Sequence, residues 1–586
     1  MENIIFINSQ SSLEEHMNTI LAYKYLGLDI ETHSLEPTED SIICIQLGDT
    51  NQAFVIDART TNLEPLLRNL EQANPLIIGH NLKFDLKHLA YKYHYEPKRV
   101  FDTMLAYGIY NNGRAKQPYV SLKDLVYEYE GVELEKDTRD TFKYTFGDLT
   151  WNQIEYAASD VEHLIPLALK LNNQLATDGL NEVAKLEFEL LNVVSDMELT
   201  GFAMDPVKWL ETTELEIELA AELAGKIATF TGETIVQSSF FGEPKYAINP
   251  NSNQQMLELF HSIGIDIPNT RAETLKHVNH KLARLLLDYR EHSKRVSTYG
   301  KTFLEKHLQE DGRIHPEYNQ LGAQSGRYSC SKPNLQNIPS DKQYRSCFVA
   351  APENYIITAD FSQIELRVAA VLSGEPAMIE EYQKKDSDLH VLTARRVYHV
   401  DEVTPFQRSR GKTCNFGIMY GISPKGFSIR FEVPIRESEQ LVAGFWKAYP
   451  VLQKYMEEQG NLTLNQGYNS SILGRRRYFP SPNMRSEKYR SEIFAIKREG
   501  ANMTIQGTAA EIMKRSMVNM YYALKPYNAH MVNTVHDEVC IECPKEFISE
   551  CSAITYNCMV DTEKEMCGDG ILWDASLGFG PTWKKV

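Results

Sequence analysis

The sequence predicts a multidomain protein that combines an α/β unit with α+β units. Its 586 residues are enough for roughly three or four domain-sized units. Hydrophobic residues make up 42% of the chain and charged residues 24%, as in ordinary globular proteins, so the chain is expected to fold as a whole. Over residues 1–176 short apolar strands alternate with helical segments, whereas the strands expected later are separated by long helical regions.

The bulk properties exclude several classes of protein. A formal net charge of −18 argues against a nucleic-acid coat protein, although it leaves room for a local basic groove. No apolar run is long enough to span a membrane, and the N-terminus lacks the basic and apolar regions of a secretory signal. The nine cysteines form no disulfide-rich pattern, which favours a reduced, cytoplasmic setting. Cys540 and Cys543 are expected to point to opposite faces of a strand as buried thiols, not as zinc ligands.

The first unit, residues 1–176, has the strand and helix pattern of an α/β domain. Strands are expected at 25–31, 41–47, 53–56 and 75–79, with a helix after the last of them. A helical stretch is expected over 151–169, with a break near Pro166. Alternation in the first of these strands places Asp29 and Glu31 on one face, where two carboxylates repel unless they are exposed or bind metal.

Three groups of polar residues in this unit carry its chemistry. Each acid alone is typical of a solvated surface, but the ordered set Asp29 and Glu31, Asn81 and Asp85, Tyr156 and Asp160 is far more specific. The set resembles the three motifs of the proofreading 3′–5′ exonucleases of the DEDD class, in the variant with Tyr in the last motif. The resemblance implies a ribonuclease-H-like fold and two divalent ions held by Asp29, Glu31, Asp85 and Asp160. It also implies that Tyr156 helps to orient the attacking water.

The middle of the chain is predicted to be a helical arm. A helix over 180–199 is expected to stop at Gly201, and a second begins with Asp205 as N-cap and Pro206 in its first turn. Residues 270–309 are again mostly helical. The arm, about 205–305, carries no cluster of acids. Its lysines and arginines could track a phosphate backbone or simply solvate the helix faces, and both interpretations stay open.

Two acids in the second half of the chain are expected to meet. A strand over 355–358 runs to Asp360, and an apolar hairpin carries His536, Asp537 and Glu538 at its tip. An isolated Asp after a strand is usually a cap or turn residue. Two carboxylates brought together from distant strands, however, suit Mg²⁺, which takes few protein oxygens and leaves room for phosphate.

The region 373–500 is largely helical and contains a cationic helix. Thr404 and Pro405 give an N-cap with Pro in the first turn, and Arg408, Lys412, Phe416 and Tyr420 follow at a spacing of four. Two cations and two rings along one face suit a triphosphate followed by a sugar or base, although an amphipathic helix has the same pattern. Gly411 within this helix indicates close packing or a hinge.

Other polar stretches are weaker signals. The basic cluster 474–477 lies in a turn, and such clusters are usually solvated. Arg498, Asn502 and Gln506 step by four along a later helix and need partners if buried. The stretches 325–329 and 333–339 are turn-rich, but their Arg, Asn and Gln side chains are types that reach sugars, phosphates and groove edges.

Assembled in order, these residues resemble the family A DNA polymerases, of the DNA polymerase I type in its large-fragment form. Motif A matches 360–367, motif B matches 408–421 and motif C matches 535–538. The stretches 325–329, 333–339 and 506–510 also match in family order. The resemblance covers essentially the whole chain. It implies a right-hand polymerase domain at 177–586, with a thumb at about 205–305, a palm at about 306–372 and 498–586, and fingers at about 373–497.

The resemblance implies a role for each motif residue. Asp360 and Asp537 would hold two catalytic Mg²⁺ ions, for which Mn²⁺ can substitute, and Glu538 would belong to the same catalytic motif. The incoming dNTP would contact Arg408, Lys412 and His390 through its triphosphate, with Gln363 near by. Phe416 would face the sugar and base, and Glu365 with Tyr420 would close the space of a ribose 2′-OH. Primer-template DNA would contact Arg327, Asn334, Gln336, Arg498, Asn502, Gln506 and His536.

The sequence departs from the family pattern at three places, where Phe361, Tyr328 and Gly411 replace the usual Tyr, Leu and Ala. The chain starts directly at the exonuclease unit, so a 5′-nuclease domain is not expected, and a phage enzyme, a short bacterial enzyme and a fragment all fit. A cytoplasmic monomer without membrane contact is expected. Two rival interpretations are an exonuclease whose C-terminal region binds DNA without polymerising, and an RNA-synthesising enzyme, which Glu365 argues against.

Overall fold

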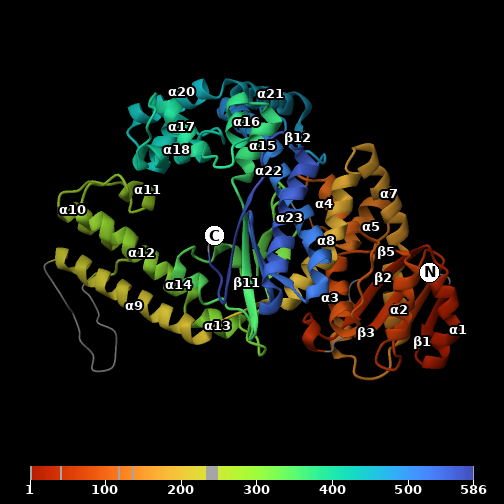
Figure 1. The fold of residues 1–586 in the computed structure, drawn as a ribbon. Coiled ribbons are helices and arrows are strands. Elements are labelled where there is room, and N and C mark those ends of the chain that lie inside the picture. Colours follow the sequence, from red (N-terminus) through yellow and green to blue (C-terminus); the bar gives the residue numbers. More distant parts are fainter. Residues whose placement is uncertain (1–2, 40–41, 116–118, 135–137, 232–247, 585–586) are drawn as a thin grey trace, which may run out of the picture.

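A computed structural model describes the chain except for residues 1–2, 40–41, 116–118, 135–137, 232–247 and 585–586. Two large units share one long helix, α8 (Asn181–Thr200), and a helical arm extends from the second unit (Figure 1). The helix α8 supplies apolar side chains to both cores: Val183, Phe188 and Leu191 to the first, and Leu186, Leu190 and Val194 to the second. The two units are therefore packed on a common element.

The first unit is a six-stranded mixed sheet with helices around it, as the α/β pattern predicts. The strand order is β1-β4-β3-β2-β5-β6, with β3 antiparallel to both of its neighbours and the other pairs parallel. The strands are β1 (Asn3–Ile7), β2 (Tyr25–Thr32), β3 (Ile42–Gly48), β4 (Gln52–Asp57), β5 (Leu76–Gly79) and β6 (Val100–Asp102). The predicted start of the third strand, Ser41, lies outside the described residues.

The helices of this unit are α1 (Gln10–Leu21), α2 (Glu64–Ala73), α3 (Leu82–Tyr93), α4 (Thr103–Tyr110), α5 (Leu122–Glu130), α6 (Trp151–Glu162) and α7 (Leu164–Thr177). The break predicted near Pro166 is confirmed, since α6 and α7 meet at His163. Pro166 thus lies in the first turn of α7, where its missing N–H needs no partner. The predicted domain boundary at 176/177 coincides with the end of α7.

The arm contains two long antiparallel helices, α9 (Pro206–Ala228) and α12 (Lys281–Tyr299), which pack along one another (Figure 1). Asp205 caps α9 by accepting the N–H of Lys208, as predicted. The arm also contains the helices α10 (Asn253–Ser262), α11 (Ala272–Leu275) and α13 (Lys301–His307). A small core of its own, including Ile227, Phe260 and Leu286, holds its outer end together. The predicted arm also includes residues 232–247, which lie outside the described residues.

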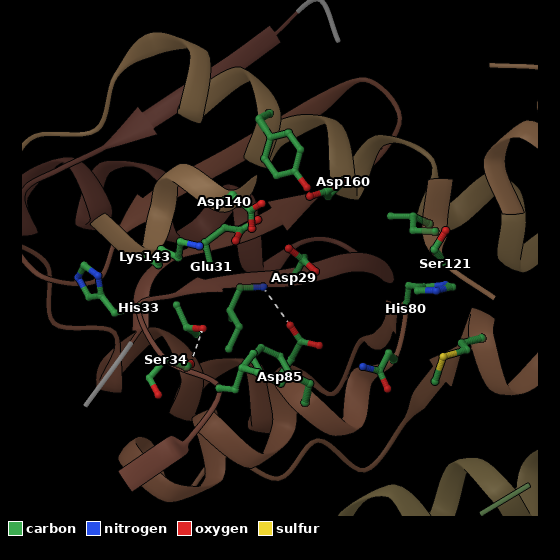
Figure 2. A pocket seen from close by; sticks show the side chains of 18 of the residues that line it. Asp29, Glu31, His33, Ser34, His80, Asp85, Ser121, Asp140, Lys143 and Asp160 are labelled. Carbon is green, nitrogen blue, oxygen red and sulfur yellow. Dashed lines mark hydrogen bonds between the residues drawn. The ribbon is translucent and has the colours of Figure 1, made fainter. Parts of the chain in front are cut away.

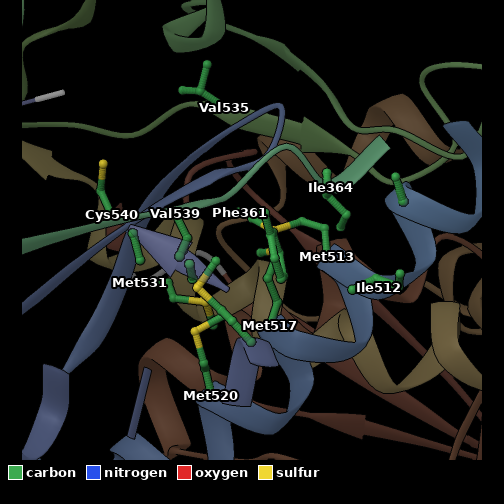
Figure 3. Packing of buried hydrophobic residues seen from close by; sticks show 14 of the residues in the cluster. Phe361, Ile364, Ile512, Met513, Met517, Met520, Met531, Val535, Val539 and Cys540 are labelled. Carbon is green, nitrogen blue, oxygen red and sulfur yellow. The ribbon is translucent and has the colours of Figure 1, made fainter. Parts of the chain in front are cut away.

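A four-stranded antiparallel sheet forms the centre of the second unit. Its order is β14-β15-β11-β16, made of β14 (His530–Val535), β15 (Glu538–Pro544), β11 (Asn354–Phe361) and β16 (Ala575–Gly580). The helices α22 (Tyr489–Leu524) and α23 (Ile548–Cys567) pack against it, and α15 (Ile364–Ser373), which follows β11, packs against α22. Figure 3 shows the methionines of α22 packed against this sheet, with Phe361 among them. Since Phe361 is buried in apolar surroundings, a tyrosine hydroxyl there would need a partner.

The remaining large elements form a helical lobe beyond α15 (Figure 1). They are α16 (Pro376–Tyr382), α17 (Leu389–Tyr398), α18 (Pro405–Gly417), α19 (Pro424–Phe431), α20 (Ile435–Ala448), α21 (Pro450–Gln466) and the hairpin β12 (Tyr468–Ser470) and β13 (Arg476–Tyr478). The sequence-based boundary at 497/498 falls inside α22, because that helix runs unbroken for 36 residues. The lobe and the central sheet therefore share a helix, so this boundary does not separate two elements.

Short elements complete the second unit: β7 (Phe202–Ala203), β8 (Arg313–Ile314), β9 (Glu317–Asn319), β10 (Ser329–Ser331) and α14 (Lys342–Arg345). Cys540 and Cys543 are both buried on β15, as the sequence predicts for structural thiols. Within the described ranges, every helix is too short or too polar to cross a membrane.

Candidate active sites

The first candidate site is a cluster of carboxylates in a cavity of about 610 Å³ beside β2. Asp29 and Glu31 come from β2, and Asp160 comes from α6, one turn after Tyr156. One oxygen of each of these three acids lies within 4.8 Å of the others. Hard oxygen ligands at this separation fit a divalent ion such as Mg²⁺. The expectation that the strand and the helix bring these acids together is confirmed.

Asp85 lines the same cavity but lies outside this three-acid cluster. Figure 2 shows its carboxylate facing that of Asp29, from the first turn of α3. Its Oδ1 accepts the N–H of Ile30 at 3.0 Å. Burial, and then the charge of Asp29, raise the pKa of Asp85 well above its usual value. The predicted four-acid set is therefore present as a cluster of three with the fourth acid opposite.

Two further side chains line this cavity although no motif in the sequence points to them. Asp140 and Lys143 come from a short 3₁₀-helix at 139–144, and Figure 2 shows Lys143 extending toward Glu31. A lone Asp and a lone Lys in a polar segment are typical of any surface, so no pattern in the sequence singles them out. His80 also lines the cavity, but both of its ring nitrogens are within hydrogen-bond distance of Thr103 and Val120.

The second candidate site lies at one edge of the central sheet, where Asp360 and Asp537 meet. Asp360 is the penultimate residue of β11 and lies opposite Glu538 in the register of β15. The N–H of Phe361 donates to the carbonyl of Asp537 at 3.1 Å, which ties the strand end to the hairpin turn. His536 takes the left-handed conformation that the tight turn requires, with φ +56°. The predicted hairpin with acids at its tip is confirmed.

Glu538 differs from its neighbour because its carboxylate points into the protein. Both of its oxygens lie within 3.0 Å of Nη1 of Arg345, and Trp583 Nε1 donates to Oε1 at 2.8 Å. The guanidinium of Arg345 also lies 4.2 Å from the ring centroid of Trp583. Burial raises the pKa of Asp537, whereas Arg327 and His536 act against that rise. Asp537, whose side chain is 31% exposed against 6% for Glu538, is the more accessible acid of this hairpin.

Gln363 and Glu365 follow Asp360 at the start of α15. Gln363 is left-handed, with φ +57°, and accepts a hydrogen bond from Tyr382 at 3.1 Å. Glu365 is buried and ion-paired with Arg327. Burial raises the pKa of Glu365 to about 7, whereas the charge of Arg327 lowers it. Arg327, expected to contact DNA, is therefore engaged by a carboxylate in this structure.

The cationic helix is α18, and Thr404 caps it in a capping box with Gln407. Arg408 forms an ion pair of 2.7 Å with Asp388, which itself caps α17. Lys412 makes no ion pair with any part of the chain that the structure describes. The ring of Phe416 is 42% exposed and lies 5.8 Å from that of His390.

Tyr420 is not part of that helix, contrary to the spacing-by-four prediction. The helix α18 ends at Gly417, and Tyr420 lies in the following turn before Gly421, whose φ is +71°. Glycine adopts this left-handed conformation most readily, and the periodic spacing of the side chains does not reveal that the chain turns here. The hydroxyl of Tyr420 is buried and finds no hydrogen-bond partner within the described chain.

The residues expected to contact DNA fall into two groups. Arg327, Gln336 and His536 line a small cavity beside Asp537, and Gln336 donates to the carbonyl of Thr534 at 3.2 Å. Asn334 caps the short 3₁₀-helix that contains Gln336. The second group is on α22: Arg498 pairs with Glu499 at 3.1 Å, Asn502 donates to the carbonyl of Tyr420 at 3.3 Å, and Gln506 is half-buried.

An acid cluster that could hold a metal ion lies in an α/β domain, which is joined to a sheet with two edge acids and a cationic helix. This combination is typical of an enzyme class with two sites for phosphodiester chemistry. The chain belongs to DNA polymerase family A, whose family model matches residues 217–585. A second model, that of the 3′–5′ exonuclease domain, matches residues 4–176. The resemblance seen in the motifs is thereby confirmed for both units.

Relatives with known names agree with this assignment. DNA polymerase I of Chloroflexus aurantiacus is 30% identical over the whole chain, which spans 64% of that relative's length. DNA polymerase I of Aquifex aeolicus is also 30% identical, with 94% of each chain covered. A solved structure of the POL domain of Pol1 from M. smegmatis, in complex with a DNA primer-template and dNTP, has a TM-score of 0.82 at 24% identity over 99% of both chains. That likeness confirms the fold.

Proposed function

We propose that the chain is a template-directed DNA polymerase that adds dNTPs to a primer 3′-OH and trims 3′ ends at a separate exonuclease site. The observation that carries this proposal is the pairing of Asp360 with the hairpin turn of Asp537, in a chain that also holds the cluster of Asp29, Glu31 and Asp160. The two sets of acids lie on different sheets. The chain would act as a monomer on primer-template DNA.

At the polymerase site Asp360 and Asp537 would hold two Mg²⁺ ions, or Mn²⁺ in their place. Such ions supply charge stabilisation for the attacking 3′-oxygen and the leaving pyrophosphate. Glu538 would fix the hairpin through Arg345 and so place Asp537. The fit rests on two carboxylates brought to one sheet edge from β11 and the β14–β15 turn.

The triphosphate would be bound by Arg408, Lys412 and His390. Burial lowers the pKa of His390 to about 4, so its ring is neutral at pH 7. Thr393 donates to the amide oxygen of Asn415, so the amide nitrogen faces Nδ1 of His390 at 2.9 Å. The ring proton is then on Nε2, where it can donate to a phosphate oxygen. Arg408 would exchange Asp388 for the triphosphate, a better-matched anion.

At the exonuclease site the three clustered acids, with Asp85 opposite them, would hold two divalent ions. Tyr156 lines the same cavity one helical turn from Asp160 and would orient the attacking water. The clustered acids would supply oxygen ligands to the ions, and the ions would supply positive charge for the phosphodiester.

The arrangement in Figure 1 supports an assignment of subdomain roles. The arm (α9 and α12) would be the thumb, the central sheet with α22 the palm, and the α16–α21 lobe the fingers. The lysines and arginines of α12 would track the primer-template backbone. The other DNA contacts would be made by Asn334, Gln336, His536, Arg498, Asn502 and Gln506.

Separate variants test the two-site proposal. Asp360→Ala or Asp537→Ala should reduce primer extension at least about a thousandfold, because each removes a ligand of both ions, while 3′ trimming persists. Asp29→Ala with Glu31→Ala should do the reverse and raise misincorporation. Asp561→Ala, an exposed acid on α23, is the matched control and should change neither activity. Loss of both activities in one folded variant would contradict separate sites.

An alternative is an exonuclease whose second unit binds DNA without polymerising. The chain has Asp360 and Asp537 at the edge of the central sheet and Lys412 on α18 of the adjoining lobe, and their presence argues against this alternative. The same assay decides the question: 3′ trimming without any extension by the unmodified protein, in Mg²⁺ with all four dNTPs, would favour the alternative.

A further inference from the structure

Arg327 connects two acids that belong to different parts of the polymerase site. It lies in the loop between β9 and β10, and its guanidinium is ion-paired with Glu365 at the start of α15. The same nitrogen, Nη2, lies 3.8 Å from Oδ1 of Asp537 in the hairpin turn. One cation therefore joins the acid proposed to exclude the ribose 2′-OH to an acid proposed to hold metal.

Glu365 depends on this contact for its orientation. Its side chain is 11% exposed, and the hydrogen bond that the described chain offers it comes from Arg327. Tyr420, the residue proposed to close the sugar space with Glu365, has a buried hydroxyl without a partner in the described chain. A buried carboxylate that loses the cation paired with it is poorly tolerated, so the Glu365 side chain would move toward water or be neutralised.

The loop that carries Arg327 is itself held in place. Gly326 has φ +86°, and a Cβ at this position would lie 2.5 Å from Nε of Arg475. Arg475 is fully buried and ion-paired with Glu187 of α8. The loop is also closed internally, since the N–H of Gly326 donates to Ala323 at 2.8 Å. The backbone from which Arg327 extends therefore has little freedom.

We propose that Arg327 is a positioning residue for the discrimination between deoxyribonucleotides and ribonucleotides. It holds the Glu365 carboxylate against the place of the sugar C2′, so that a 2′-OH meets a fixed group and not a mobile one. The inference rests on the proposed polymerase function and on Glu365 as the sugar gate. It differs from a DNA contact, in which Arg327 would act on the primer and not through Glu365.

A double-mutant cycle separates these two roles. The variants are Arg327→Ala, Glu365→Ala and the double variant, and the measurement is kcat/KM for one dNTP and its matching rNTP on the same primer-template. We expect Arg327→Ala to lower the dNTP:rNTP preference at least about tenfold. Because Arg327 acts through Glu365, adding Arg327→Ala to Glu365→Ala should leave the preference at the value of Glu365→Ala alone.

Several results would overturn the proposal. An unchanged preference in Arg327→Ala, with lower kcat/KM for both nucleotides, would assign Arg327 to the primer. Independent, multiplying effects of the two substitutions in the double variant would show that Arg327 does not act through Glu365.

If Arg327→Ala fails to fold, Arg327→Gln replaces it. The glutamine keeps a hydrogen-bond donor without the charge, so this variant should still lower the dNTP:rNTP preference. Arg327→Lys, which keeps the charge, should retain part of the dNTP:rNTP preference that Arg327→Ala loses.

Arg313→Ala provides the matched control. Arg313 is also ion-paired with a buried glutamate, Glu542, but at the opposite end of β15 from the hairpin turn. Arg313→Ala should leave the dNTP:rNTP preference unchanged. If it changed the preference as much as Arg327→Ala does, the effect would be a general loss of packing, and the proposal would be overturned. Absence of any extension by the unmodified protein would instead contradict the proposed polymerase function.

Discussion

Phe416 presents a bare ring edge where the incoming sugar is proposed to lie. A normal dNTP carries a 3′-OH that can interact with its own phosphate, and a dideoxynucleotide lacks it. The Phe416 ring is 42% exposed and offers no polar group to compensate. A missing hydrogen bond to a charged group costs about 1.5–3 kcal/mol, which is roughly ten- to a hundredfold in incorporation. We therefore expect the protein to discriminate against dideoxynucleotides.

Phe416→Tyr should sharply lower the preference for dNTP over ddNTP, because its hydroxyl can fill the polar gap, and should leave dNTP extension nearly intact. Chain termination across a ddNTP:dNTP titration measures the effect. Phe406→Tyr adds the same hydroxyl at an exposed position of the first turn of α18 and should have no effect. Equal termination by wild type and Phe416→Tyr would show that Phe416 does not face the sugar.

Single residues differ in how well the sequence predicts what surrounds them in the fold. Asp29, Glu31 and Asp160 meet as predicted because strand alternation and helical spacing determine which side chains share a face. Arg475, expected to be solvated in a basic turn, is fully buried. Its partner Glu187 lies 288 residues earlier, and such a pairing has no local pattern.

At the scale of elements, the contact between α17 and α18 depends on Gly411. A Cβ at this position would lie 2.2 Å from the carbonyl oxygen of His390, a backbone atom that cannot give way without moving the helix. Gly411 lies between Arg408 and Lys412, and His390 belongs to the same proposed triphosphate site. The close packing that Gly411 indicated in the sequence is therefore confirmed.

Gly411→Ala restores the residue common in the family but should impair this protein. Separating the two helices would move His390 relative to Lys412, so we expect KM for dNTP to rise about tenfold with a smaller change in kcat. Steady-state primer extension measures both constants. Gly444→Ala on α20 is the matched control, because its Cβ would lie 3.3 Å from a side-chain methyl of Val397 and 3.6 Å from the nearest backbone atoms, which is ordinary contact. A KM unchanged by Gly411→Ala would show that α17 and α18 adjust freely.

Element boundaries were predictable where a local signal sets them. The caps at Asp205 and Thr404, and the break before Pro166, follow from side chains within one turn of the boundary. The placement of Tyr420 beyond α18 was not predictable, since the periodic pattern continues after the helix has ended. The long helix α22 crosses the subdomain boundary that the resemblance implied at 497/498, because that boundary divides the chain by role and not by where a helix ends.

At the scale of the whole molecule, α8 links the central sheet to the first unit partly through a histidine. His530 of β14 lies 3.1 Å from Asp196 of α8. The hydrogen bond with Asp196 is the main reason that the pKa of His530 is raised. A raised pKa in the folded state gives stability that is fully present below the unfolded value of about 6.5 and is lost as pH rises through the folded pKa.

His530→Asn should therefore lower the thermal midpoint more at pH 5.5 than at pH 8.5, relative to wild type. In the free energy of unfolding, the loss at pH 5.5 should exceed the loss at pH 8.5 by less than about 1 kcal/mol. The side chain of His530 is 38% exposed, so water screens its interaction with Asp196. Thermal unfolding of both proteins across this range measures it. A difference that grows with rising pH would have the wrong sign for this mechanism.

The two units should unfold together, because one buried charge network joins the helix that they share to the rest of the second unit. Glu187 of α8 is ion-paired with both Arg475 and Lys514, and all three side chains are at most 2% exposed. Glu511 completes a set of two acids and two cations. Burial lowers the pKa of Lys514 to about 8, whereas Glu187 raises it, so the cation depends on its partner.

Glu187→Gln keeps the shape of the side chain but leaves two buried cations against one acid. The loss should be about 3–5 kcal/mol in the free energy of unfolding, because an unpaired buried charge is left behind. Glu189→Gln on the same helix removes the partner of Arg515 at a partly exposed site and should cost less than about 1 kcal/mol. Denaturant unfolding, followed by separate probes in the first unit and in the central sheet of the second, measures both variants. Since α8 contributes to both cores, both probes should shift to lower denaturant together in Glu187→Gln. Unfolding of the second unit alone, with the first unit unchanged, would show that the two units are stabilised independently.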